Sequence, residues 1–97
     1  MFLQKNFQSC FLSFDGGARL ELMHKPEIPD NTNDLLTQNI GLIHFAIAVG
    51  SKEKVDALTS ELRKSGVEIL DGPRITGDGY YESVVLDPEG NRIEVTV

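Results

Sequence analysis

The sequence is poor in cysteine, with Cys10 as the only one among 97 residues. A single cysteine forms no disulfide within its own chain, which is typical of a protein of the reducing cytoplasm. No clear basic partner lies near Cys10 in the sequence, and a reactive thiolate needs one. We therefore expect Cys10 to be a small packing residue rather than a nucleophile.

Long apolar runs and positive charge are also scarce. No run approaches the roughly 18 apolar residues of a membrane-spanning helix, and the first ten residues lack the long apolar region of a signal peptide. Lys and Arg number 9 against 15 Asp and Glu, for a net charge of −6. Such a charge argues against nucleic acid or an anionic membrane surface as a partner, and we expect a cytoplasmic protein with a small-molecule ligand.

What is present is typical of one small globular domain, with 40% apolar and 25% charged residues. Residues 7–14 and 18–23 alternate like strands around Asp15-Gly16-Gly17, a strong hairpin turn. Residues 25–39 carry two prolines and a polar run, which indicates a connecting segment. We therefore divide the chain into a terminal hairpin (1–24), a connection (25–39) and a complete module (40–97).

The module reads as β-α-β-β-β. A nearly continuous apolar strand is predicted over 40–49, with the bulky residues on one face and His44 on the other. Ser51 is a helix N-cap, and the helix runs through Ser65 to Gly66. A short strand at 67–70, a turn at 71–73 and an extended piece at 74–76 follow. The fold class is therefore α+β.

A final hairpin is predicted over 79–97, around the turn Asp87-Pro88-Glu89-Gly90-Asn91. In its second strand Ile93, Val95 and Val97 share one face, and Glu94 lies on the other with Arg92 and Thr96. Arg92 is expected to pair with a neighbouring carboxylate. Glu94 alone fits either a solvated strand residue or part of a site, and spacing alone leaves both readings open.

The two hairpins form an internal repeat. Residues 14–22 match 86–95 with one inserted turn residue, and Glu94 lies 73 residues after Glu21. At that offset the first unit has its hairpin but no leading strand and no helix. No helix of the first unit then covers the apolar face of Leu20 and Leu22. Leaving these side chains exposed costs about 1.5–3 kcal/mol each. We expect either an N-terminally short form of a longer domain or a homodimer that covers this face.

The stretches GLIHFAIAV and GDGYYESVVLDPEGNRIEV resemble the vicinal oxygen chelate superfamily (glyoxalase, bleomycin resistance protein, dioxygenase), and the resemblance covers residues 7–97. It implies a glyoxalase-like β-α-β-β-β module preceded by the terminal hairpin of an incomplete one. Paired modules of this family form a cup around a divalent metal. By position, Glu21, His44 and Glu94 match metal ligands, and the fourth ligand would belong to a segment absent here.

One imidazole and two carboxylates suit Zn²⁺, Ni²⁺, Co²⁺, Mn²⁺ or Fe²⁺ and leave positions open for substrate. The resemblance implies a lyase or isomerase of the lactoylglutathione lyase type, acting on a small thiol adduct or α-hydroxycarbonyl through an enediolate. In such a reaction Glu94 or Glu21 is the catalytic residue that moves the proton.

Alternatives remain open at this point. His44 alone also fits a hydrogen-bonded core histidine. Arg74, Tyr80 and Tyr81 could bind substrate, but rim packing and strand pairing explain them as well. The alternative to the enzyme is a non-catalytic dimer of the bleomycin-resistance type that sequesters a ligand, and a third hypothesis is an inert fragment that folds only on dimerising.

Overall fold

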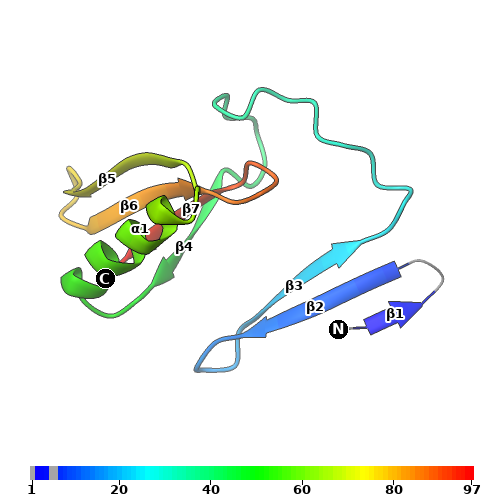
Figure 1. Cartoon of the computed structure of the whole chain (residues 1–97), viewed down its shortest axis with the longest axis horizontal. Coiled ribbons are helices and arrows are strands. Elements are labelled where there is room, and N and C mark those ends of the chain that lie inside the picture. The colour runs from blue at the N-terminus through cyan, green and yellow to red at the C-terminus, as the bar shows by residue number, and fades with distance from the viewer. Residues whose placement is uncertain (1, 5–6) are drawn as a thin grey trace. The chain divides into compact units, whose positions relative to one another are not determined.

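The computed structural model describes residues 2–4 and 7–97 of the chain. By their contacts these residues divide into two compact units, Met1–Thr32 and Asn33–Val97. Figure 1 labels the helix and strands of both units. Within the described part of the chain, no helix has the length and apolar character needed to cross a membrane.

The first unit is an antiparallel sheet in the order β1-β2-β3. Its strands are β1 (Phe2–Gln4), β2 (Phe7–Ser13) and β3 (Arg19–His24). The predicted hairpin is confirmed, and its turn needs glycine because Gly16 and Gly17 have φ of 91° and 96°. β1 was not predicted, because a strand of three residues is too short to give a periodic signal.

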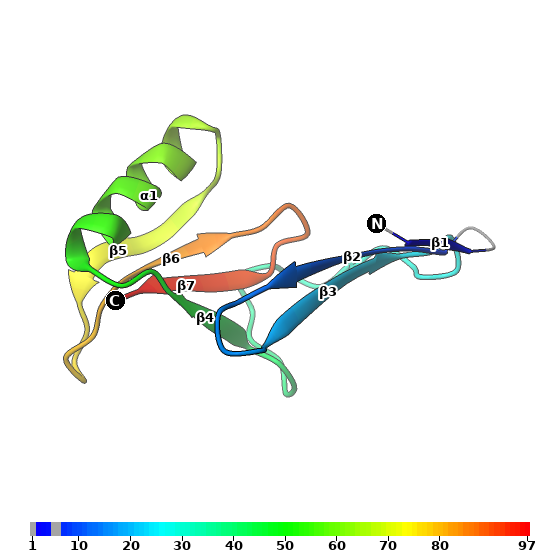
Figure 2. The same ribbon diagram turned by 90° about the horizontal axis from the view of Figure 1, so that it is seen from below.

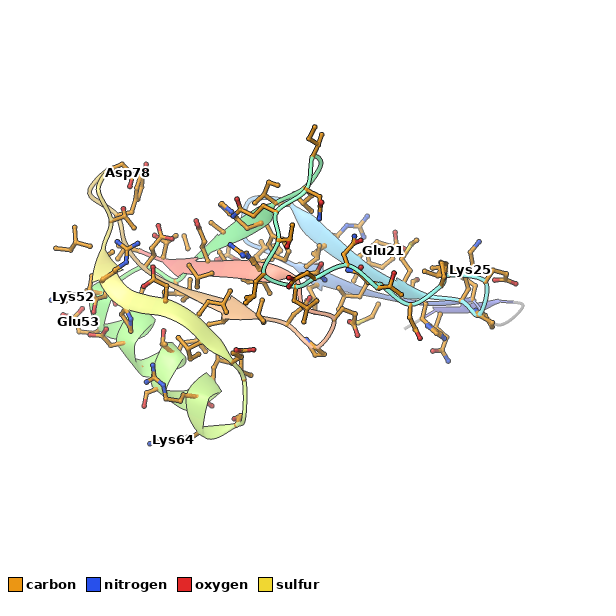
Figure 3. All side chains as sticks on the ribbon, turned by 90° about the horizontal axis from the view of Figure 1, so that it is seen from above. Glu21, Lys25, Lys52, Glu53, Lys64 and Asp78 are labelled. Atoms are coloured by element: carbon orange, nitrogen blue, oxygen red, sulfur yellow. The ribbon has the colours of Figure 1, made fainter. Side chains whose placement is uncertain are left out.

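Register assigns the side chains of this hairpin to two faces. Leu12 lies opposite Leu20 and Cys10 opposite Leu22, whereas Phe11 lies opposite Glu21 on the other face. Leu22 is 51% exposed, so the predicted apolar face is open in this structure. Glu21 is exposed as well, and its side chain projects from β3 in Figure 3.

The second unit confirms the predicted β-α-β-β-β order. It consists of β4 (His44–Ala48), α1 (Lys52–Lys64), β5 (Ile69–Ile75), β6 (Tyr81–Leu86) and β7 (Arg92–Thr96). The strands lie in the order β4-β7-β6-β5, with β4 parallel to β7 and the other pairs antiparallel. The first and last strands of the module are therefore neighbours.

Helix α1 covers one face of this sheet (Figure 2). The Ser51 hydroxyl accepts a hydrogen bond from the Lys54 backbone N–H at 3.2 Å, so the predicted N-cap is confirmed. The helix packs its apolar side on β5, β6 and β7, with Val55 and Thr59 fully buried. Lys52, Glu53 and Lys64, labelled in Figure 3, lie on its outer side.

The core between helix and sheet includes one polar pair. Thr59 Oγ1 donates to the Val55 carbonyl at 2.7 Å, and the hydroxyls of Thr59 and Ser83 lie 2.7 Å apart. Both side chains are fully buried. Because each hydroxyl has a partner, this pair satisfies the requirement for hydrogen bonding in the core.

Two predicted boundaries were wrong. The strand expected over 40–49 begins at His44, and Ile40 and Leu42 are 107% and 83% exposed. The expected turn at 71–73 lies inside β5, which runs continuously from Ile69 to Ile75. Register shifts in its pairing with β6 absorb the irregularity, and Gly72 takes a φ of 79° there. A bulged strand and a turn use the same residue types, so composition did not distinguish them.

Candidate functional site

A cavity of about 560 Å³ lies on the face of the second-unit sheet opposite α1. Strand alternation determines which residues line this cavity. Ile47 and Val95 point toward the helix, so His44 and Glu94 point toward the opposite face. Its lining comes from β4, β5, β6, β7 and the loop between β5 and β6. The lining residues are His44, Ala46, Asp71, Arg74, Thr76, Asp78, Tyr80, Glu82, Val84, Glu94 and Thr96.

His44 and Glu94 come together in this cavity. Parallel pairing sets Ala46 opposite Glu94, and His44 lies two residues before Ala46 on the same face of β4. His44 Nε2 and Glu94 Oε2 are 3.1 Å apart. The side chains of His44 and Glu94 are 40% and 22% exposed, so the carboxylate is the more enclosed of the two.

Glu82 is a third ionisable residue in this cavity, and it was not predicted from the sequence. Val84 pairs with Glu94 across β6 and β7, and Glu82 lies two residues from Val84 on the same face. Burial raises the pKa of Glu82, and the charge and hydrogen bond of Glu94 and the charge of Asp78 raise it further, while His44 opposes them. The alternation in GYYESVVL would have assigned Glu82 to the face of Val84, but the strand order was needed to place it beside Glu94.

The proposed substrate-binding residues divide between the two faces of the sheet. Arg74 and Tyr80 line the cavity. Arg74 Nε donates to Asp71 Oδ2 at 2.8 Å, so part of its guanidinium is already engaged. Tyr81 lies on the helix face instead, where its hydroxyl donates to Asp56 and Lys52 Nζ lies 5.1 Å from its ring centroid.

Tyr81 therefore does not contact the cavity that contains His44 and Glu94. The hydrogen bond to Asp56 raises the pKa of the Tyr81 phenol, with smaller contributions from burial and from the charge of Asp56. These contacts are those of a residue that joins the helix to the sheet.

Glu21 belongs to the first unit, whereas His44 and Glu94 belong to the second. The second unit therefore contains two of the three predicted ligands, His44 and Glu94, and the first unit contains Glu21. Among residues 2–4 and 7–97, no group of three or more His, Cys, Asp or Glu side chains has the arrangement to hold a metal ion.

The pair itself has suitable geometry for two ligands of one ion. Ligand atoms about 2.1 Å from an ion, at angles of about 90–110°, lie roughly 3.0–3.4 Å apart. The 3.1 Å between His44 Nε2 and Glu94 Oε2 falls in that range. An imidazole with a carboxylate is also a donor set that divalent first-row metals accept. The residues fit a metal, but one unit supplies only part of its coordination sphere.

Comparison with known proteins agrees with this fold. The profile of the Glyoxalase/Bleomycin resistance protein/Dioxygenase superfamily matches residues 4–95. No curated protein matches the sequence significantly. Divalent metals are common in this superfamily, although the part of the chain described here contains no complete metal site.

Several solved structures share the architecture. A glyoxalase/dioxygenase from Nostoc punctiforme has 18% identity and a TM-score of 0.77, over 91% of this chain and 58% of that one. A glyoxylase/bleomycin resistance protein/dioxygenase domain from Frankia sp. EAN1pec has 19% identity and a TM-score of 0.75, over 98% and 72%. The trypanothione-dependent glyoxalase I of Leishmania major has 24% identity and a TM-score of 0.63, over 94% and 59%.

These identities are low, so the structural matches establish the fold alone. The chain spans less than two thirds of the length of the Nostoc and Leishmania proteins. The family profile, in contrast, covers nearly every residue. On that match, the chain belongs to the glyoxalase/bleomycin resistance protein/dioxygenase superfamily.

Proposed function

We propose that this chain forms part of a divalent-metal-dependent lyase or isomerase of the glyoxalase kind. Its substrate would be a small thiol adduct or α-hydroxycarbonyl, as for a lactoylglutathione lyase. The observation that carries the proposal is the 3.1 Å approach of His44 Nε2 to Glu94 Oε2 inside a cavity on the open sheet face. The single cysteine suits a cytoplasmic location.

In this proposal His44 and Glu94 hold the ion together with Glu21, supplied from a second copy or a longer assembly. The bound ion would act as a Lewis acid for the negative charge that develops on the substrate as an enediolate. Glu94 accepts the proton removed from the substrate carbon and returns it to the neighbouring carbon, because its carboxylate faces the cavity. Glu21 is the alternative residue for this proton transfer.

Residues around the pair would bind and orient the substrate. Arg74 and Tyr80 line the same cavity and offer a guanidinium and a phenol. A second carboxylate, Glu82, disfavours further negative charge near Glu94, because the two carboxylates interact and like charges repel. Binding of a cation relieves that repulsion, which is a reason for metal to be retained there.

The test is elemental analysis of purified protein dialysed in turn against Zn²⁺, Ni²⁺, Co²⁺, Mn²⁺ and Fe²⁺. We expect stoichiometric retention of at least one metal and its loss in His44→Ala, Glu94→Gln and Glu21→Gln. His24→Ala is the matched control, because His24 lies opposite Gln8 on the other face of β3 from Glu21. Failure of every metal to be retained, or equal retention in His44→Ala, would rule out this ligand set.

A second candidate is a non-catalytic dimer of the bleomycin-resistance type that sequesters a ligand. It is favoured by the cavity of about 560 Å³, whose lining includes Arg74 and Tyr80 and so offers a ligand polar contacts without a metal. This candidate predicts that His44→Ala leaves ligand affinity unchanged, measured by titration with bleomycin as the probe. A loss of metal and of affinity together in His44→Ala would favour the enzyme instead.

Both candidates include self-association that covers the face of Leu20 and Leu22. Leu22 is 51% exposed, and burial of such a side chain contributes about 1.5–3 kcal/mol. We expect sedimentation to give a dimer, and Leu22→Lys to shift it toward monomer. A compact monomer at all concentrations would contradict this part of the proposal.

A further inference from the structure

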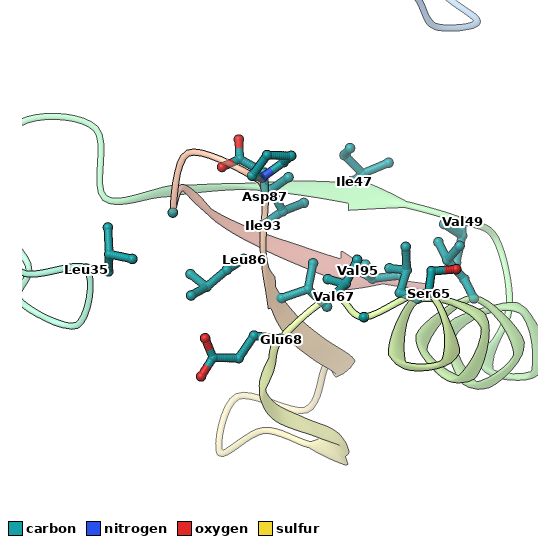
Figure 4. Close-up of a pocket in the computed structure, with 16 residues that line it drawn as sticks. Leu35, Ile47, Val49, Ser65, Val67, Glu68, Leu86, Asp87, Ile93 and Val95 are labelled. Atoms are coloured by element: carbon teal, nitrogen blue, oxygen red, sulfur yellow. The ribbon is translucent and has the colours of Figure 1, made fainter. Parts of the chain in front are cut away.

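A large apolar cleft of the second unit lies on the opposite side of the sheet from His44 and Glu94. It has a volume of about 620 Å³ between α1 and the sheet (Figure 4). Leu58 and Leu62 of α1 form one wall, and Ile47, Ile93 and Val95 form the other. Ligand pockets in proteins have volumes of about 300–1,000 Å³ and mainly apolar walls, so this cleft has the size and lining of one.

The cleft exists because the helix covers only part of the sheet. Helix α1 packs against β5, β6 and β7, whereas no Cα atom of α1 lies within 8 Å of a Cα atom of β4. The side chains of Ile47 on β4 and of Val49, just after it, therefore extend beyond the helix and stay half-buried. Val55 and Thr59 on the same helix are fully buried, and neither of them lines the cleft.

Contacts from the segment before β4 fix one end of the cleft. Leu35 lines the cleft and packs against Gly90. The two are so close that a Cβ atom added to Gly90 would lie 3.0 Å from Leu35 Cδ1. Arg92 Nη2 donates to the Leu36 carbonyl at 2.9 Å, so Arg92 anchors this segment instead of pairing with a carboxylate as predicted. Leu35 therefore belongs to a held wall of the cleft, as Figure 4 shows at the side away from the helix.

Two carboxylates line the cleft, those of Glu68 and Asp87. The Asp87 carboxylate accepts hydrogen bonds from Glu89 N and Asn91 N at 3.0 and 2.8 Å within its own turn. Glu68 is exposed, and within the described ranges no hydrogen bond or ion pair engages its carboxylate. A ligand with an apolar body in the cleft would therefore meet a free negative charge at its exit.

The dimensions argue for a small molecule over a protein segment. A helix about 10 Å wide occupies roughly 400 Å³ per turn, so the cleft would take fewer than two turns. We propose that the cleft binds a linear amphipathic cation, with its alkyl chain between α1 and the sheet and its ammonium group beside Glu68. This site is separate from the His44–Glu94 cavity and does not depend on the function proposed for it.

The test is calorimetric titration with n-alkylamines from hexylamine to dodecylamine, each kept below its micelle concentration. We expect the affinity to rise about fourfold per added methylene until the cleft is full and then to level off. Alkanoates of equal length should bind more weakly than the amines. Glu68→Gln should weaken amine binding about threefold and leave the matching alkanol unaffected, because an exposed ion pair is weak.

Two variants fill the cleft from different walls. Leu62→Trp does so from the helix, and Ile47→Phe does so from β4, where an aromatic residue suits a strand. Either should abolish amine binding, with folding verified by circular dichroism. His44→Ala should leave binding unchanged, which separates this site from the proposed metal site.

Four results would overturn the proposal. These are no binding by any amine of the series, equal affinity for amines and alkanoates, undiminished binding by both filled variants that fold, and loss of amine affinity as protein concentration rises. The last result would mean that a second copy of the chain occupies the cleft.

Discussion

Gly72 lies close to the backbone of β6 beside the candidate site, which yields a sharp prediction for Gly72→Ala. Gly72 lies in β5 at the irregular pairing with β6, with a φ of 79°. A Cβ added there would lie 2.5 Å from the Glu82 carbonyl oxygen and 3.1 Å from the Ser83 Cα. Both are backbone atoms of β6, so no side-chain rotation relieves the overlap.

The expected loss of stability follows from two contributions. Left-handed φ costs an L-residue about 1–2 kcal/mol, and forced backbone displacement in a packed region costs about 1–3 kcal/mol. Together they predict that Gly72→Ala lowers the free energy of unfolding by roughly 2–5 kcal/mol. That is a large share of the stability of a domain of this size, which is about 5–15 kcal/mol.

The assay is urea unfolding followed by far-ultraviolet circular dichroism, with Gly77→Ala as the matched control. Gly77 lies in the loop after β5, its φ is not positive, and no heavy atom lies within 4 Å of its ideal Cβ. The control should change stability by no more than about 0.5–1 kcal/mol in either direction. Equal unfolding midpoints for the two variants would refute the close approach of β5 to β6 at Glu82.

Three further predictions concern the same unit. Thr59→Val leaves the buried Ser83 hydroxyl without a partner and should lower the free energy of unfolding in urea by about 1–3 kcal/mol. Adding Ser83→Ala should recover part of that loss. Strictly additive effects of the two substitutions would contradict the interaction between these hydroxyls. Because the pKa of Glu82 is raised above its ordinary 4.5, its contribution to stability is full below that value and is lost as pH rises through the folded pKa. Glu82→Gln should therefore flatten the pH dependence of unfolding, and an unchanged slope would contradict it. Tyr81→Phe removes the hydrogen bond to Asp56 but should leave binding at the open face unchanged, measured for metals by elemental analysis and for a ligand by titration with bleomycin.

Local signals explain why much of the second unit was predictable from the sequence. Ser51 caps the helix, Gly66 ends it with a φ of 91°, and the turn at 87–91 joins two clearly alternating strands. Each of these features depends on residues near one another in the chain. The opposite faces assigned to His44 and Ile47 were correct for the same reason, since alternation needs only the strand itself.

Contacts that depend on the order of strands in the sheet could not be predicted from local sequence patterns. Glu82 meets Glu94 because β6 lies beside β7, and Arg92 reaches the Leu36 carbonyl across 56 residues of sequence. Tyr81 was grouped with Tyr80 because they are neighbours in sequence, yet consecutive strand residues point to opposite faces. Attention to alternation alone would have separated these two tyrosines.

The structure also bears on whether Glu94 is only a solvated strand residue. Its side chain is 22% exposed on the central strand β7, beside His44 and in the same cavity as Glu82. Two carboxylates close enough to raise the pKa of one of them destabilise the fold, and folding has no need of such a pair. Ile93 and Val95 on the other face of β7 pack toward the helix, and this packing offsets the repulsion between the carboxylates. Like-charged groups held together by two paired strands are typical of a functional site, so Glu94 is the residue whose substitution tests the function of this fold most directly.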